Sequence, residues 1–182
     1  DPHALNDYQY DANTNALNQI DKFDITRRPE LDLATWKLGA EEKKDDNGIT
    51  YWAGYSDKAN PEDGRRIETI IYFGDKDNAK IEKIFTGYRL NPGTGQYEAK
   101  YRVDYTYSGN NITETKKYDI SGGADVLIEQ STYAGDGDNN KIQETKYFKA
   151  SDQVNPFQRT TYTYDAASKL LSTVTYSKKA DG

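Results

Sequence analysis

Residues 96–120, with the sequence QYEAKYRVDYTYSGNNITETKKYDI, decide the fold of this chain. From residue 97 to residue 107, apolar or aromatic side chains alternate with polar ones almost without interruption. Successive side chains of a strand point to opposite faces, so this period of two predicts a half-buried β-strand. Residues 108–111 have the composition of a turn, and residues 112–120 are expected to return as the second strand of a hairpin.

In this hairpin we expect Tyr107 to lie opposite Ile112 and Tyr101 opposite Tyr118, because apolar partners would then share one face. Similar units recur through the chain: an aromatic residue ends a strand, a polar turn rich in Gly, Asp and Asn follows, and Ile or Leu opens the next strand. Connections this short make neighbouring strands antiparallel. The sequence therefore predicts an all-β fold, an antiparallel meander of repeated β-hairpins.

We expect residues 1–182 to form a single β-repeat domain. Residues 49–176 hold the regular hairpin repeats, residues 1–48 are less regular, and residues 177–182 are expected to be a frayed tail. Residues 24–44 are compatible with a short helical segment that starts near Pro29, or with a strand. The turn sequence that follows them favours the strand as one arm of a hairpin.

The composition predicts a thin core. Ile, Leu, Val and Phe account for 30 of the 182 residues. Chains in which these residues make up less than roughly 20% are often disordered. However, 16 residues are Tyr, and Tyr, Thr and Ile suit a pleated surface. Ordered β structure with a thin, Tyr-rich core is the better interpretation. Tyr occurs on both phases of the alternation, so an open twisted sheet and a rolled sheet both remain compatible with the pattern.

Charge and residue usage exclude several classes of function. The 24 basic and 30 acidic residues are well mixed, so the basic patch of a nucleic-acid-binding protein is missing. No apolar run approaches ~18 residues, so no membrane span is expected. The chain has no Cys and one His, His3, which leaves little for nucleophilic or zinc chemistry, and we expect no enzyme activity. With Asp1 first and no Met, the chain is expected to be a processed mature form or an excised segment.

Two groups of residues are candidate ligand sites. Asp136, Asp138 and Asn140 place oxygens at alternating positions, as calcium loops do. The alternative is that these residues simply form a turn. Calcium is the one cofactor that the sequence suggests. A row of tyrosines is the candidate platform for a polysaccharide, with cross-strand packing as the alternative: Tyr97, Tyr101, Tyr105 and Tyr107.

The terminal hairpins are the candidate assembly edges. An open sheet leaves unpaired strand edges, and such edges recruit further strands. We therefore expect self-association through the sheet edges near both ends of the chain. The residues expected to take part are Tyr8, Tyr10, Leu170, Val174 and Tyr176.

Residues 162–176, YTYDAASKLLSTVTY, resemble the YD (Rhs) repeat of bacterial surface and secreted proteins. In that family Tyr-Asp is followed by two small residues, Gly, a basic residue and Leu. Here Tyr164 and Asp165 are followed by two alanines, and Lys169 and Leu170 match the end of the motif, with Ser168 in place of Gly. The resemblance implies β-hairpin repeats of the kind found in large extracellular proteins, without catalytic residues of their own.

These observations lead us to expect a non-enzymatic, extracellular or cell-surface protein with a structural role. It would be a subunit of a fibre, sheath or layer, or a segment of a larger surface protein. Its chains would join by strand addition, in which backbone hydrogen bonds supply the affinity. Two alternatives stay open: a carbohydrate-binding or adhesin module that uses a tyrosine face, and a fragment of a YD-repeat toxin-delivery shell.

Overall fold

The computed structural model describes residues 4–24, 41–44, 50–53, 66–91, 93 and 96–178. In these ranges the regular structure is β-strand, apart from one 3₁₀ turn, Gly137–Asn139. Consecutive paired strands run antiparallel, so the predicted all-β meander is confirmed. The chain forms two compact units, Asp1–Lys100 and Tyr101–Gly182. The expectation of a single domain had rested only on the recurring strand-turn pattern of the sequence.

The first unit contains a group of four neighbouring strands and two short hairpins. The four strands, in spatial order, are β1 (Ala4–Tyr10), β2 (Leu17–Asp24), β5 (Arg66–Phe73) and β6 (Lys80–Thr86). The hairpins pair β3 (Glu41–Lys44) with β4 (Thr50–Ala53) and β7 (Arg89–Asn91) with β8 (Gln96–Glu98). The pairing of β3 with β4 fits the hairpin expected there. The prediction for residues 25–40 lies outside the described residues, as does His3.

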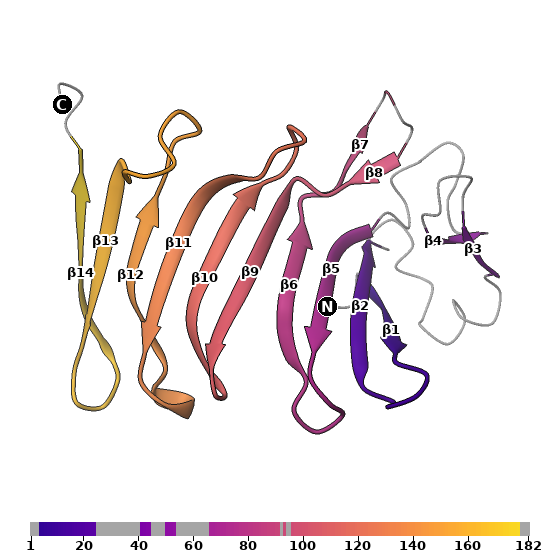
Figure 1. The fold of residues 1–182 in the computed structure, drawn as a ribbon, viewed down its shortest axis with the longest axis horizontal. Coiled ribbons are helices and arrows are strands. Elements are labelled where there is room, and N and C mark those ends of the chain that lie inside the picture. The colour runs from indigo at the N-terminus through magenta and orange to yellow at the C-terminus, as the bar shows by residue number, and fades with distance from the viewer. Residues whose placement is uncertain are drawn as a thin grey trace. The chain divides into compact units, whose positions relative to one another are not determined.

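The second unit is a single antiparallel layer whose spatial order follows the chain (Figure 1). Its strands are β9 (Tyr101–Ser108), β10 (Asn111–Asp119), β11 (Val126–Ala134), β12 (Lys141–Tyr147), β13 (Gln158–Tyr164) and β14 (Leu170–Ser177). Each strand pairs with the next, and β14 pairs with β13 alone among the described residues of the unit. The sheet is therefore open and twisted, not rolled.

One local design recurs in five hairpins, three of them in the second unit. A tyrosine in the last two residues of the first strand lies directly opposite an Ile or Leu in the first two residues of the second strand. The pairs are Tyr10–Leu17, Tyr72–Ile81, Tyr107–Ile112, Tyr133–Ile142 and Tyr164–Leu170. In each hairpin the next residue is left unpaired as a β-bulge: Asn18, Glu82, Thr113, Gln143 and Leu171. A bulge strengthens the local twist and shifts the alternation by one residue.

The bulges correct the register predicted for the central hairpin. Tyr107 faces Ile112, as expected, but Tyr101 faces Asp119 instead of Tyr118. The physical reason is the extra residue at the start of β10, which moves every later side chain to the other face. The equivalent bulge at Gln143 places Tyr147 on the same face as Ile142, although the two residues are on opposite phases of the sequence alternation. Once each bulge is counted, the alternation in the sequence agrees with the strand register.

The hydrophobic core is thin, and most of it belongs to the first unit. Among the described residues, the buried apolar side chains are Ala16, Ile20, Phe23, Ile70 and Phe148, and only Phe148 belongs to the second unit. The second unit instead buries three hydroxyl side chains, Ser131, Thr145 and Thr160. A single layer has no second layer to pack against, so its side chains must shield one another within each face.

Candidate functional site

A ladder of hydroxyl side chains crosses one face of the second unit. Its members lie directly opposite one another on five consecutive strands: Thr115, Ser131, Thr145, Thr160 and Thr175. The hydroxyls of Ser131 and Thr145 are 2.9 Å apart, as are those of Thr160 and Thr175. Both Ser131 and Thr145 are 2% exposed. A hydroxyl both donates and accepts a hydrogen bond, so paired hydroxyls can satisfy one another where water is excluded.

Beside this hydroxyl ladder runs a row of aromatic and aliphatic side chains, which we call the tyrosine stripe. It consists of Tyr107, Ile112, Tyr133, Ile142 and Tyr162, one from each of the strands β9 to β13. The Tyr133 hydroxyl lies 3.5 Å from the Thr115 hydroxyl, and the Tyr162 hydroxyl lies 3.5 Å from that of Thr145. Each ring therefore reaches from its own strand across to the preceding one and partly covers the ladder.

Two further tyrosines gather around the stripe. Burial raises the pKa of Tyr164, and the nearby Tyr162 and Tyr133 reinforce this shift. Burial also raises the pKa of Tyr147, with smaller contributions from Glu129 and Tyr162. Tyr133 and Tyr162 are thus close enough to act on Tyr164, and Tyr162 is close enough to act on Tyr147, which indicates one cluster of tyrosines on this face.

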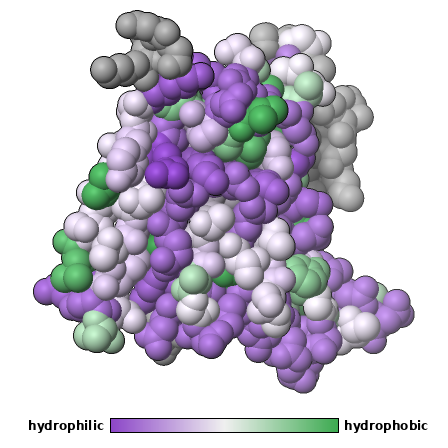
Figure 2. Space-filling model, turned by 60° about the vertical axis from the view of Figure 1, so that its left-hand side comes forward, coloured by the Kyte–Doolittle hydropathy of each residue, from purple (hydrophilic) through white to green (hydrophobic). Residues whose placement is uncertain are grey.

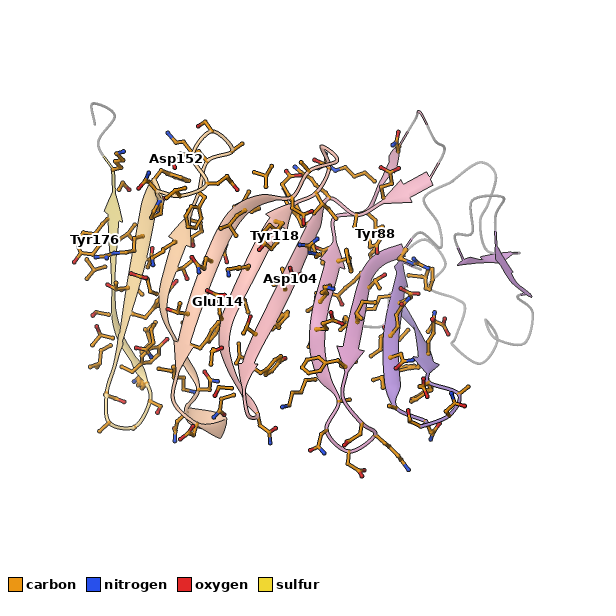
Figure 3. All side chains as sticks on the ribbon, viewed as in Figure 1. Tyr88, Asp104, Glu114, Tyr118, Asp152 and Tyr176 are labelled. Carbon is orange, nitrogen blue, oxygen red and sulfur yellow. The ribbon has the colours of Figure 1, made fainter. Side chains whose placement is uncertain are left out.

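The opposite face of the same sheet carries charges, and these are paired. Glu114 accepts hydrogen bonds from Lys116 and Gln130, and Glu144 pairs with Lys146 at 2.9 Å and with Arg159 at 3.4 Å. Burial opposes ionisation of Glu114, but its hydrogen bonds outweigh burial and hold its pKa below the usual range. Glu114 lies on β10 in Figure 3, beside Asp104 of β9. We call this side the charged face.

Arg102 ties the first strands of the charged face together. Its guanidinium group binds Asp104 through two hydrogen bonds of 2.8 and 3.0 Å, and it binds Asp125 at 2.8 Å. It also lies 4.7 Å from the centre of the Tyr118 ring, which is labelled in Figure 3. Burial alone would lower the pKa of Arg102, but the two carboxylates outweigh it and raise the pKa. One guanidinium group thus binds two carboxylates and one aromatic ring, which favours a structural role for Arg102.

The outermost strand, β14, differs from the other strands of its unit. Every one of its residues is exposed, and none of them is charged. Its large apolar or aromatic residues expose about half of their surface: Leu170 49%, Leu171 62%, Val174 44% and Tyr176 53%. Figure 2 turns this side of the molecule forward and shows small separate hydrophobic patches on a largely hydrophilic surface. Within the part of the chain that the structure describes, the outer edge of β14 therefore combines backbone groups that pair with no strand and apolar side chains.

The predicted assembly residues fall on the outer strands of the two units. Leu170, Val174 and Tyr176 lie together on β14, where the Arg159 guanidinium stacks 5.2 Å from the Tyr176 ring. Tyr8 and Tyr10 lie on β1 of the first unit and are 50% and 56% exposed. Both groups are thus accessible to a partner.

The predicted tyrosine row is not continuous. Tyr101, Tyr105 and Tyr107 share β9, but Tyr97 belongs to β8, and its side chain lies outside the described residues. The break follows Glu98, where the Lys100 backbone N–H donates to the Thr86 carbonyl at 3.1 Å. Tyr133 and Tyr162 belong to the stripe and were not predicted as site residues. The recurring Tyr-turn-Ile pattern was the signal that could have found Tyr133.

The turn predicted to bind calcium connects neighbouring hairpins. Asp136 accepts a hydrogen bond of 2.7 Å from the Asn111 side chain, and the Asn140 side chain donates to the Ile112 carbonyl at 2.8 Å. The Asp138 side chain lies outside the described residues. Among the side chains that the structure does describe, no three of His, Cys, Asp or Glu are grouped to hold a metal ion. Calcium binding stays a prediction, and the hydrogen bonds of Asp136 and Asn140 favour the turn-forming alternative.

The first unit contains a buried carboxylate that sequence reasoning missed. Asp21 is fully buried and accepts hydrogen bonds from Thr69 at 2.5 Å and Gln19 at 2.7 Å. Arg66 supplies the countercharge at 3.2 Å, and the Tyr88 hydroxyl donates to Thr69 at 2.8 Å. Burial raises the pKa of Tyr88. The charges of Asp21 and Arg66 match, and the Arg66 Nε atom is buried without a hydrogen-bond partner. The paired charges favour a structural role for this network.

The chain matches no protein-family model and no curated protein. Among solved structures, it is similar to a protein with unknown function from Bacteroides fragilis NCTC 9343. The two chains are 12% identical, the match covers 94% of this chain and 90% of that chain, and the TM-score is 0.38. A likeness of this size carries no argument about function. Among the described residues, no helix is long and apolar enough to cross a membrane.

Proposed function

We propose that this chain is a non-catalytic structural protein that joins other chains by strand addition at β14, within an extracellular surface assembly. The observation that supports the proposal most directly is the exposure of every residue of β14, without a single charge. Natural edge strands are normally protected from pairing by charged residues, prolines or covering loops. β14 has neither a charge nor a proline among its residues. Its sequence thus favours pairing with another strand.

The side chains and the backbone would both contribute to this association. Leu170, Leu171, Val174 and Tyr176 expose about half of their surface, so burying each contributes on the order of 1 kcal/mol. Each backbone hydrogen bond to an added strand contributes about another 1 kcal/mol net. Association of two proteins loses several kcal/mol of translational and rotational freedom. One edge therefore gives a modest affinity, which suits an assembly in which many contacts act together.

The mass of the chain in solution tests this proposal. We expect sedimentation or light scattering to show association that increases with protein concentration. Val174→Lys places a charge at the centre of the outer strand and should leave the chain monomeric. Thr163→Lys is the matched control, since Thr163 is exposed on the neighbouring strand β13 and should tolerate the charge without loss of association. A wild-type chain that stays monomeric at millimolar concentration would contradict the proposal.

A further inference from the structure

The three tyrosines of the tyrosine stripe recur at a fixed interval. Tyr107, Tyr133 and Tyr162 come from β9, β11 and β13, so one strand lies between each tyrosine and the next. Neighbouring strands are about 4.8 Å apart, which places these tyrosines roughly 9.6 Å from one another across the sheet. All three are half-buried and so keep part of their surface accessible. The stripe therefore offers a periodic row of aromatic rings.

Two of these rings are held in the same posture. The Tyr133 hydroxyl lies 3.5 Å from that of Thr115, and the Tyr162 hydroxyl lies 3.5 Å from that of Thr145, each on the preceding strand. A ring held at its far end on a neighbouring strand lies along the sheet instead of standing upright from it. Its accessible surface then includes a face of the ring and not only the phenol tip. The posture recurs because each tyrosine follows a ladder residue by two positions, Tyr133 after Ser131 and Tyr162 after Thr160.

The stripe and the adjoining hydroxyl ladder are uncharged, and the charged residues of this face, Lys117 and Glu129, lie beyond the ladder, beside Tyr101 and Tyr147. The stripe contains only Tyr and Ile, and the adjoining hydroxyl ladder contains only Thr and Ser. The charges of Glu114, Lys116 and Glu144 lie on the opposite face. At its outer end this face also presents the exposed hydroxyls of Thr173 and Thr175 on β14. A ligand that matches this surface is neutral, carries many hydroxyl groups and has apolar faces for the rings.

We propose that the tyrosine stripe binds an extended, neutral, β-linked polysaccharide that lies across the strands. Aromatic rings stack on the apolar C–H faces of pyranose sugars, and their polar tips suit a wet interface. In an extended β-1,4-linked chain, alternate sugars present the same face, and this repeat of two sugars is close in length to two strand spacings. The three rings would then contact every second sugar of a cellulose-like or chitin-like chain. This site is distinct from the outer edge of β14 and does not depend on assembly.

The test measures binding of a cello-oligosaccharide and a chito-oligosaccharide long enough to span β9 to β13. The full-length chain should bind one of them, and Tyr133→Ala and Tyr162→Ala should each weaken that affinity about tenfold. Tyr118→Ala is the matched control, because Tyr118 lies on the charged face of the same sheet, and its binding should equal that of the wild type. Circular dichroism confirms that each variant is folded.

Two conservative variants keep the proposal testable if an alanine variant fails to fold. Tyr133→Phe and Tyr162→Phe retain the rings and remove only the hydroxyls, so they should retain most of the affinity. Loss of binding in both phenylalanine variants would overturn stacking as the mechanism. The proposal is also overturned if the wild type binds neither oligosaccharide, or if Tyr118→Ala weakens binding as much as Tyr133→Ala. Repeating the measurement on the Val174→Lys variant separates this site from assembly, because glycan binding should survive there.

Discussion

Replacing Thr145 by valine tests whether the hydroxyl ladder stabilises the second unit. Thr145 is 2% exposed and its hydroxyl lies 2.9 Å from that of Ser131, which is also 2% exposed. Valine has nearly the same shape and a high preference for strands, so packing and propensity change little. The substitution removes one hydrogen bond and leaves the Ser131 hydroxyl buried without that partner. We expect the free energy of unfolding to fall by about 2 kcal/mol, from roughly 1 kcal/mol for the bond and the remainder for the stranded hydroxyl.

The double variant Ser131→Ala with Thr145→Val gives the sharper measurement. The double variant removes both hydroxyls, so neither is left buried without its partner. It should therefore be more stable than Thr145→Val alone, apart from the small loss of volume at Ser131. Urea unfolding followed by circular dichroism measures all four states of the cycle, and the coupling energy should be at least about 1 kcal/mol. Thr163→Val, on the exposed side of β13, should change stability by less than about 0.5 kcal/mol. Strictly additive effects of the two substitutions would refute this account of the ladder.

Two further predictions concern the charged groups. Asp21→Asn removes the countercharge of Arg66 in the buried network of the first unit, so stability should fall by about 3 kcal/mol in urea unfolding; a loss below about 0.5 kcal/mol would show that the pair is not stabilising. Glu114 has a pKa held below its usual range, chiefly by its bonds to Lys116 and Gln130 against the opposing effect of burial. The Glu114 carboxylate therefore contributes to the free energy of unfolding at a pH above its pKa in the unfolded chain, and this contribution is lost as the pH falls through its pKa in the folded chain. Glu114→Gln should flatten this acidic part of the plot of stability against pH.

The strands could be predicted from the sequence because the period of two is local information. Residues 101–107 alternate, and the turn composition of residues 108–111 marks the end of the strand. The bulges could not be predicted in the same way. Thr113 is a polar residue at a position where alternation also expects a polar residue, so nothing local shows that it is unpaired. The register beyond Thr113 depends on pairing with β9, and one unpredicted bulge reverses the face of Tyr118.

The position of a candidate site residue could be predicted where one strand determines it. It could not be predicted where contacts between several strands determine it. Val174 and Tyr176 share a face of β14, as alternation predicts, whereas the bulge at Leu171 places Leu170 on the other face, opposite Tyr164. Tyr97 was misplaced because the break before β9 involves a hydrogen bond to Thr86, which is remote in sequence. The burial of Asp21 depends in the same way on Thr69, which lies 48 residues further along the chain. An acidic residue in an alternating strand otherwise indicates an exposed position.

The bulges also give a reason to place assembly at β14 instead of β1. In four of the five hairpins the unpaired bulge residue is polar: Asn18, Glu82, Thr113 and Gln143. In the hairpin of β13 and β14 the equivalent residue is Leu171, which is 62% exposed. Formation of the bulge does not require a leucine, because the equivalent residue is polar in the other four hairpins. An apolar side chain beside an unpaired edge is what strand addition requires. On β1, by contrast, Tyr8 and Tyr10 alternate with polar residues and carry hydroxyls that water can satisfy.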